Sequence, residues 1–251
     1  MSDPAAGTLF IVSTPIGNLE DITIRAVRVL KEVGVIAAED TRHTKQLCTH
    51  FGITTPLTSY HDFNKEEKTA ILLERLRSGT DVALVSDAGT PVISDPGYFL
   101  ITRSIEANIR VVPVPGPSAV LAALAASGLP TDAFRFEGFL PRKDGPRSKR
   151  IESLREDSAS LILFESPHRI GKLLASLRAI LGNRRAVLAR ELTKRFEEFH
   201  RGTLDELLTQ VQAHPPKGEI TLVVEGVSKR KRSDREDNPL KERDCQDGID
   251  A

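Results

Sequence analysis

The stretch "DVALVSDAGTPVISDPGYFL" (residues 81–100) begins as an apolar run, Val82 to Val85, which stops at Ser86-Asp87. Glycine, proline, serine and aspartate then dominate residues 88–97, and these residue types favour turns. A short apolar run bounded in this way is typical of a buried strand. In open α/β sheets, ligands bind beyond the carboxyl ends of the strands. The stretch therefore predicts a buried strand followed by a ligand-binding loop.

Two further predicted strands end in the same way, in "VSTPIGN" (12–18) and "VPGPSA" (114–119). Glycine lets the backbone approach a ligand closely, and proline stiffens a loop so that little order is lost on binding. Three such loops favour a shared binding site over three ordinary turns. None of them matches the dinucleotide fingerprint GxGxxG or the phosphate loop GxxxxGK[ST], which argues against NAD or a nucleoside triphosphate.

Strand-like and helix-like segments alternate along the chain, and this alternation indicates an α/β fold. Strands are expected at 8–14, 34–40, 81–87, 109–116, 134–140, 160–166, 186–192 and 219–226, and helices at 22–33, 65–78 and 118–128. We expect two α/β domains, residues 1–117 and 118–228. Residues 229–251 hold seven basic and seven acidic residues and almost nothing apolar, so this tail is predicted to be disordered.

The composition is that of an ordinary globular chain of 251 residues, with 39% hydrophobic and 28% charged residues. Thirty-five basic residues balance thirty-five acidic ones, so nucleic-acid binding would need a local basic patch. No apolar stretch reaches the roughly 18 residues of a membrane helix, and the first residues lack a signal peptide. Cys48 and Cys245 are isolated, which argues against a zinc site or disulfides. We expect a cytoplasmic protein without a metal site.

Six ordered motifs carry a family resemblance. They are "STPIGNLEDITIRAV" (13–27), "AAEDTRHT" (37–44), "SDAGTPVISDPG" (86–97), "VPVPGPSAVLAALAASGL" (112–129), "EGFLPRK" (137–143) and "FESPHR" (164–169). Together they resemble the ribosomal RNA small-subunit methyltransferase I family of the tetrapyrrole methylase superfamily, whose members use S-adenosylmethionine. The resemblance runs from about Gly7 to Gly226, and "EDTRHT" and "ESPHR" single out the RNA-modifying branch.

The resemblance implies a two-domain α/β, tetrapyrrole-methylase-like fold with S-adenosylmethionine in a cleft between the domains, and usually a homodimer. The implied reaction is methyl transfer to the ribose 2′-hydroxyl of a cytidine in the decoding region of 16S ribosomal RNA. The substrate is naked RNA or the assembled small subunit. Members of the family often continue past the last strand with a small helical domain, and here a polar tail stands in its place.

The resemblance also assigns cofactor residues. They are Pro15, Ile16, Asp87, Ala88, Gly89, Ser118, Ala119, Phe164, Ala189 and Thr221. Ser118 and Ala119 would open a helix whose free N–H groups can meet a carboxylate. The last three residues would wall the adenine. A turn-capping role remains the alternative for Asp87, and plain strand packing is the alternative for Phe164, Ala189 and Thr221.

A ribose hydroxyl is a weak nucleophile, so a nearby base or cation would help the transfer. The tentative catalytic candidates are Glu39, Asp40, Arg42 and His43 in "EDTRHT" and His61 in "SYHDFN", with Asn64 and Glu165 as weaker ones. An acidic pair at a strand end can tune neighbouring pKa values. A lone histidine is more often structural, and the residues do not identify one general base.

A basic loop, "FLPRKDGPRSKR", is the expected RNA contact. Its candidates are Arg142, Lys143, Arg147, Lys149 and Arg150, joined by His168 and Arg169 of "ESPHR". A solvated charged loop is the alternative. Two other functions stay open: a tetrapyrrole or protein-side-chain methylase of the same superfamily, and a non-catalytic RNA-binding protein that senses an adenosyl ligand. The basic run favours RNA over a tetrapyrrole.

Overall fold

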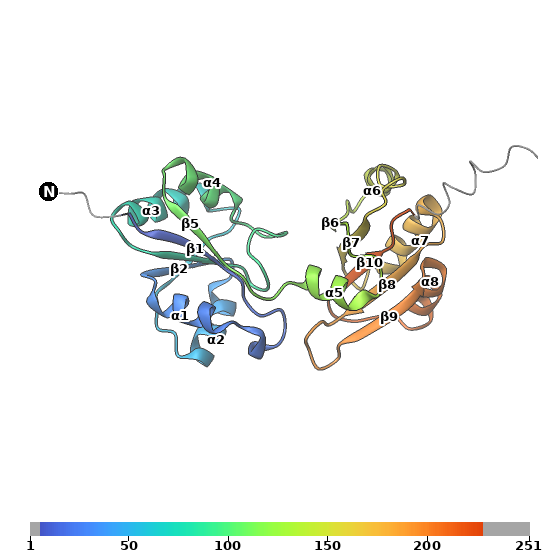
Figure 1. Cartoon of the computed structure of the whole chain (residues 1–251), viewed down its shortest axis with the longest axis horizontal. Helices are drawn as coiled ribbons and strands as arrows, with labels where there is room; N and C mark the ends of the chain where they lie inside the picture. Colours follow the sequence, from blue (N-terminus) through green and yellow to red (C-terminus); the bar gives the residue numbers. More distant parts are fainter. Residues whose placement is uncertain (1–5, 228–251) are drawn as a thin grey trace, which may run out of the picture.

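A computed structural model describes residues 6–227 as two α/β lobes, each built on a five-stranded sheet (Figure 1). The strands of the first sheet are β1 (Thr8–Val12), β2 (Val35–Ala38), β3 (Leu57–Ser59), β4 (Val82–Val85) and β5 (Arg110–Val114). Their order is β3-β2-β4-β1-β5, and all neighbours pair in parallel. Parallel sheets are covered on both faces, which explains why β2 and β4 read as unbroken apolar runs.

Helices cover both faces of this first sheet. Its helices are η1 (Leu19–Asp21), α1 (Ile24–Glu32), α2 (Thr41–Phe51), α3 (Lys65–Arg77) and α4 (Tyr98–Glu106). One buried cluster joins α1 and α2 to the sheet through residues such as Leu30 and Cys48. A second cluster on the opposite face joins α3 and α4 through Leu72 and Leu100. Figure 1 shows the sheet between these two helical layers.

The second sheet is mixed. Its strands are β6 (Phe134–Phe139), β7 (Ser160–Glu165), β8 (Arg185–Arg190), β9 (Glu198–Thr203) and β10 (Ile220–Val224), in the order β6-β7-β10-β8-β9. Only β6 and β7 pair in parallel. One face packs against α6 (Asp144–Glu152), α7 (Ile170–Leu181) and α8 (Leu204–Ala213). The other face packs against α5 (Ala119–Ser127), which lies between the lobes in Figure 1.

The chain leaves β1 and β4 toward opposite faces of the first sheet, because α1 covers one face and α4 the other. β1 and β4 are neighbours, so a crevice opens between the loops that follow them. The loop after β4 also reaches the second sheet. A Cβ added to Gly138 of β6 would lie 3.1 Å from Ser94 Oγ. The two lobes therefore meet at the carboxyl edge of the first sheet.

The predicted α/β fold class is confirmed. Each strand expected from the sequence is present but has fewer residues than expected. The prediction of a basic loop at 142–150 is wrong, because most of this segment forms α6. Gly145-Pro146 suggests a turn, yet proline is tolerated in the first turn of a helix, where N–H groups have no intrahelical partner. The domain boundary at 117/118 stays a prediction. The expected disorder of 229–251 lies outside the described residues.

Sequence patterns also missed several elements: α2, β3, α4, α7, β9 and α8. β3 is only three residues long, and α2 is rich in threonine and histidine, which are weak helix formers. Across residues 6–227, no helix combines the length and the apolar character needed to cross a membrane.

Leu222 lies in β10, the central strand of the second sheet, and is completely buried. We predict that Leu222→Ala lowers the free energy of unfolding by about 2–5 kcal/mol, because the substitution leaves a cavity. Leu121→Ala is the control, since Leu121 is 55% exposed on α5. The control should change stability by about 0.5 kcal/mol or less. Urea denaturation measures both variants, and equal losses would contradict the placement of β10 in the core.

Candidate functional site

Two backbone hydrogen bonds tie the loop after β1 to the loop after β4. Thr14 N–H donates to Gly89 O at 2.9 Å, and Gly89 N–H donates to Thr14 O at 3.0 Å. Gly89 has φ +80°, which strains a residue with a side chain. A Cβ at Gly89 would also lie 3.3 Å from Ile16 Cγ2. The two loops therefore form one rigid wall that lets a ligand approach the backbone.

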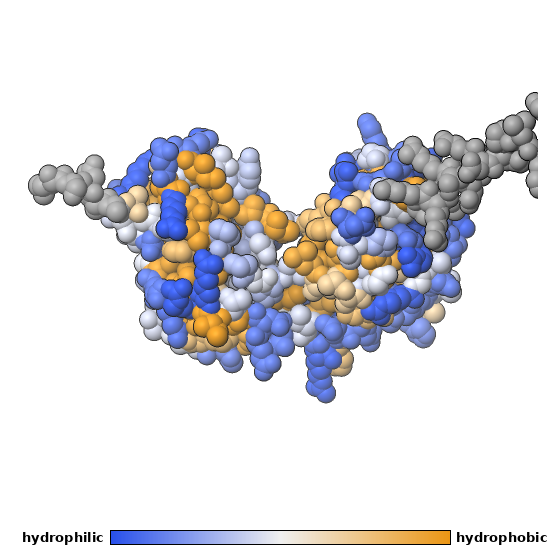
Figure 2. All heavy atoms as spheres, viewed as in Figure 1, coloured by the Kyte–Doolittle hydropathy of each residue, from blue (hydrophilic) through white to orange (hydrophobic). Residues whose placement is uncertain are grey.

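A pocket of about 390 Å³ lies between this wall and the second sheet, and we call it the interlobe pocket. Its apolar lining is Ile16, Ala88, Ile93, Ala119, Phe139, Phe164 and Ile220, and its polar groups include Asp95, Glu165 and Thr221. Figure 2 shows the hollow between the lobes, with hydrophobic residues on both sides. Its volume and its mixture of apolar walls with a few polar groups are typical of a small-molecule site.

Aromatic rings form the wall of the interlobe pocket on the side of the second sheet. The ring of Phe164 lies 4.9 Å from that of Phe136 and 5.7 Å from that of Phe139, measured between centroids. Phe139 is 58% exposed, so part of this wall faces the open space of the pocket. A flat π-face of this kind suits a purine ring.

The first turn of α5 borders a small extension of the interlobe pocket, about 50 Å³ in volume. Ser118 caps the helix, with its Oγ accepting a hydrogen bond from Leu121 N–H at 3.4 Å. The other N–H groups of a first helical turn have no intrahelical partner and favour an anion. The extension is therefore suited to a carboxylate.

Three carboxyl groups line the main volume of the interlobe pocket, those of Asp95, Glu165 and Glu219. Burial raises the pKa of Asp95, and the nearby Asp87 carboxylate raises it further. The Glu165 side chain is 1% exposed, and its Oε2 lies 3.1 Å from Arg169 Nη2. Its Oε1 accepts a hydrogen bond from Ser166 N–H at 2.8 Å. Negative charge beside apolar walls favours a ligand that carries positive charge.

The structure brings most of the expected cofactor residues together. Ile16, Ala88, Ala119, Phe164 and Thr221 line the interlobe pocket, and Gly89 and Ser118 line its extension. Three of the ten lie elsewhere. Pro15 and Asp87 line a neighbouring pocket of about 290 Å³ on the α2 side, and Ala189 is fully buried in the core. The structure thus favours the packing alternative for Ala189.

The carboxylate of Asp87 has a structural partner. Its Oδ1 accepts a hydrogen bond from Asp40 N–H at 3.0 Å, which joins the end of β4 to the end of β2. This long-range contact is not the local turn cap of the alternative, which would bond a backbone N–H about two residues further along the chain. Asp87 still faces the 290 Å³ pocket, together with His43.

Glu39 follows β2 directly and is only partly buried. Burial, together with the negative charges of Asp95, Asp87, Asp62 and Asp40, raises the pKa of Glu39 to about 7. Asp95 lines the interlobe pocket, and its charge acts on Glu39, so Glu39 lies near that pocket. A carboxyl group that is half ionised near neutral pH can accept a proton there.

Asp40 and Arg42 of "EDTRHT" are paired with each other. Asp40 caps α2, with its Oδ1 accepting from Arg42 N–H at 2.8 Å. The Arg42 guanidinium folds back onto the same carboxylate, at 2.6 Å from Nη2 to Oδ2, and holds the pKa of Asp40 well below its usual range. These pairings give Asp40 and Arg42 a structural role at the start of α2.

His61 lies in the turn after β3. Its Nε2 is 3.2 Å from Asn64 Nδ2, and Asn64 Oδ1 accepts from His61 N–H at 2.9 Å. Its Nδ1 is buried and has no hydrogen-bond partner among residues 6–227. The weaker candidate Asn64 therefore shapes this turn, whereas one ring nitrogen of His61 is buried without a partner.

Two of the expected RNA contacts are engaged within the second lobe. Arg147 is 7% exposed, and its guanidinium contacts Asp144 Oδ1 at 2.6 Å and Ser176 Oγ at 3.3 Å. The structure therefore removes Arg147 from the phosphate-binding set. Arg150 forms two hydrogen bonds to the buried carboxylate of Glu137, at 2.7 and 3.0 Å.

Four of the remaining basic candidates are exposed. Arg142 and Lys143 directly precede the first residue of α6, and Lys149 lies in its last turn; all three are exposed and form no ion pair inside the described range 6–227. His168 is exposed as well, whereas Arg169 donates to Leu140 O at 2.9 Å and pairs with Glu165. The contact of this patch with RNA stays a prediction.

Sequence analysis missed several residues of the interlobe pocket, among them Ile93, Asp95, Phe139 and Ile220. Asp95 belongs to the loop after β4, in which Val92 and Ser94 have φ of 76° and 68°. Such backbone conformations are costly without glycine and cluster at functional sites. Only the structure shows them, because nothing in the residue types Val92 and Ser94 requires a positive φ.

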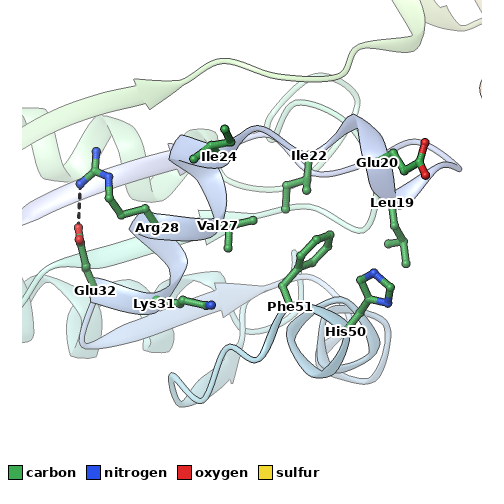
Figure 3. Close-up of a pocket in the computed structure, with 10 residues that line it drawn as sticks. All are labelled: Leu19, Glu20, Ile22, Ile24, Val27, Arg28, Lys31, Glu32, His50 and Phe51. Carbon is green, nitrogen blue, oxygen red and sulfur yellow. Dashed lines mark hydrogen bonds and ion pairs between the residues drawn. The ribbon is translucent and has the colours of Figure 1, made fainter.

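An apolar groove of about 550 Å³ lies on the outside of the first lobe, between η1, α1 and the end of α2 (Figure 3). Leu19, Ile22, Val27 and Phe51 form its floor, and Arg28 pairs with Glu32 at its rim at 2.9 Å. All of its residues come from one lobe. Within residues 6–227 no cluster of three or more His, Cys, Asp or Glu could hold a metal ion. The interlobe pocket remains the best ligand site.

Comparisons with known proteins agree with this site. The family model of the tetrapyrrole (corrin/porphyrin) methylases matches residues 8–208. Ribosomal RNA small subunit methyltransferase I of Halalkalibacterium halodurans is 53% identical, over 88% of this chain and 76% of the relative. The proteins of the same name from Pseudomonas aeruginosa and Escherichia coli O157:H7 are 52% and 50% identical, over 88% and 90% of this chain and 80% of each relative.

Solved structures share the fold at low identity. Diphthine synthase aligns with a TM-score of 0.67 and 19% identity, over 88% of this chain and 90% of that chain. Cobalt precorrin-4 methyltransferase aligns with a TM-score of 0.63 and 18% identity, over 87% of this chain and 94% of that chain. The family expected from the six motifs is confirmed: the chain belongs to the ribosomal RNA small subunit methyltransferase I family of tetrapyrrole methylases.

Proposed function

We propose that the protein is a methyltransferase that transfers a methyl group from S-adenosylmethionine to the ribose 2′-hydroxyl of a cytidine in 16S ribosomal RNA. The observation that carries this proposal is the interlobe pocket, built from strand-end loops of both sheets. The chain that forms this pocket shares about half of its aligned residues with small-subunit ribosomal RNA methyltransferases. The other branches of the superfamily match only as folds, at 18 to 23% identity.

The residues of the interlobe pocket fit S-adenosylmethionine, which supplies a methyl group activated on a sulfonium. Phe164, Ile16 and Ala119 offer apolar surface for the adenine. Asp95 and Glu165 provide negative charge for the positively charged parts of the molecule. The first turn of α5 offers N–H groups to its carboxylate. These three kinds of contact, from two lobes, support the choice of cofactor.

The chain's own contribution to the transfer is positioning and proton movement. The paired loops after β1 and β4 form a fixed wall, so the reacting groups meet with little loss of freedom. We assign Glu39 as the group that accepts the proton of the ribose hydroxyl, because its pKa of about 7 matches neutral conditions. Exposed Arg142, Lys143 and Lys149 would meet RNA phosphates. The homodimer and the cytoplasmic location stay predictions.

The direct test is transfer of tritiated methyl groups from S-adenosylmethionine to unmethylated small ribosomal subunits and to naked 16S ribosomal RNA. Nucleosides released from the product should carry the label as 2′-O-methylcytidine. Label on a base, on a protein or on a tetrapyrrole would contradict the proposed reaction. Binding of S-adenosylmethionine without any transfer would favour an RNA-binding sensor instead.

Ala88 is exposed and lines the interlobe pocket, so a larger side chain there would occupy the cofactor's space. We predict that Ala88→Leu weakens S-adenosylmethionine binding at least tenfold, about 1.4 kcal/mol, without lowering the melting temperature. Ala125→Leu is the matched control, on an exposed position of α5 that does not line the pocket. Isothermal titration calorimetry measures both affinities. Unchanged affinity in Ala88→Leu would place the cofactor elsewhere.

Glu39→Gln should change stability in a pH-dependent way. Because the pKa of Glu39 is raised from 4.5 to about 7 in the folded protein, its ionisation opposes folding as pH rises through that window. The variant should match the wild type at pH 4 and be more stable at pH 8.5. The gain is about 1 kcal/mol, since solvent screens this partly exposed group. Thermal melts at the two pH values measure the difference.

Glu39→Gln should also lower the rate of methyl transfer by about 10²- to 10⁴-fold, because glutamine cannot accept the proton of the ribose hydroxyl. Glu74→Gln, on an exposed turn of α3, is the control and should change neither property. Full transfer by Glu39→Gln would assign the proton to another group. A stability difference independent of pH would contradict the raised pKa.

A further inference from the structure

The loop between β8 and β9, residues 191–197, crosses from the second lobe to the first, and we call it the β8–β9 tip. The side chains of Lys194 and Thr193 lie against Gly17 of the loop after β1 and leave no room for a Cβ at that position. Lys194 Nζ also lies 3.2 Å from Glu219 Oε2, and Glu219 lines the interlobe pocket. The tip therefore borders the proposed methyl-transfer site.

The tip is rigid and strained. Glu191 and Thr193 have φ of 51° and 66°, conformations that cost free energy for residues with side chains. Internal contacts hold this shape: Thr193 N–H donates to Glu197 Oε2 at 2.6 Å, and Lys194 Nζ lies 3.0 Å from Glu191 Oε1. A backbone held in such conformations beside a pocket points to a functional role for the residues at its apex.

The apex presents one cation and one aromatic ring to solvent. Phe196 is 62% exposed, and Arg195 Cζ lies 5.5 Å from the centroid of its ring. Arg195 forms no ion pair with any residue between 6 and 227. The acidic side chains of Glu191 and Glu197 are engaged inside the tip. The apex therefore offers an unpaired positive charge beside an open π-face.

We propose that the β8–β9 tip binds single-stranded RNA next to the target nucleotide, with Phe196 stacked on a base and Arg195 at a phosphate. The proposal rests on the proposed function, since it needs an RNA substrate. Unpaired RNA is recognised through bases stacked on aromatic side chains and through basic side chains along its backbone. Gly17, under the tip, also lines the 290 Å³ pocket that holds His43 and Asp87. RNA bound by the tip would pass beside the interlobe pocket and the 290 Å³ pocket.

The test measures binding of a fluorescein-labelled, cytidine-containing single-stranded RNA and of its duplex, at several salt concentrations. Phe196→Ala should weaken single-strand binding roughly fivefold to a hundredfold, the loss expected for one stacked base. Arg195→Ala should reduce the slope of log K against log salt by about 0.7, the value for one phosphate contact on a single strand. The affinity for S-adenosylmethionine should stay unchanged in both variants.

Two matched controls lie away from the tip. Phe134→Ala removes a ring that is 45% exposed at the first residue of β6, the end opposite to Phe139 of the pocket. Arg77→Ala removes an exposed positive charge from the last turn of α3. Neither control should change RNA binding. Equal losses in a control and in its matching tip variant would overturn the proposal.

Other outcomes are equally decisive. A loss of duplex binding as large as the loss of single-strand binding would rule out stacking. A loss seen with assembled subunits but not with the RNA would assign the tip to a protein contact, and a changed sedimentation coefficient would assign it to self-association. If the wild type methylates small subunits and both tip variants bind RNA normally, the tip proposal fails alone. If the wild type transfers no methyl group, the proposed function fails as well.

Discussion

The backbone pair between Thr14 and Gly89 is the contact on which the site depends. It holds together two loops whose strands send the chain to opposite faces of the first sheet, so the crevice between them keeps a fixed width. Only glycine takes φ +80° there without strain, and the absence of a side chain leaves the backbone open to a ligand. The loop after β4 then reaches Gly138, and the β8–β9 tip reaches Gly17. The two lobes therefore contact each other at Gly138 and at Gly17, where the absence of a side chain lets the other lobe approach closely.

Charge is distributed unevenly around this framework. At the carboxyl ends of β2 and β4 several carboxylates share one neighbourhood, and burial, together with their repulsion, raises the pKa of Glu39. Most nearby cations are already paired, as Arg42 is with Asp40 and Arg169 with Glu165. Repulsion of this kind lowers stability, and proteins tolerate it where a function requires a perturbed group. An uncompensated acidic edge beside the interlobe pocket is consistent with proton transfer there.

Sequence patterns predicted the strand-end loops well, because an apolar run that stops at glycine and proline has few other structural meanings. They could not predict which way each loop residue faces. Ile16 and Ala88 face the interlobe pocket, whereas their neighbours Pro15 and Asp87 face the α2 side. They also failed where tertiary contacts decide: Arg147 resembles a solvated cation but is buried against Asp144 and Ser176. The exposed Arg195-Phe196 pair had no motif to mark it, since only the folded tip shows that both side chains are free.

Hydrogen–deuterium exchange with and without S-adenosylmethionine tests most directly whether the ligand bridges the two lobes. A ligand in the interlobe pocket should slow exchange in three segments far apart in the chain: the loop 86–97 of the first lobe, and the strand-end segments 164–167 and 218–221 of the second. Protection of both lobes at once is the expected result, because the pocket is lined from both sheets. Protection confined to residues 19–32 and 50–51, which line the outer groove of Figure 3, would contradict the assignment of the site.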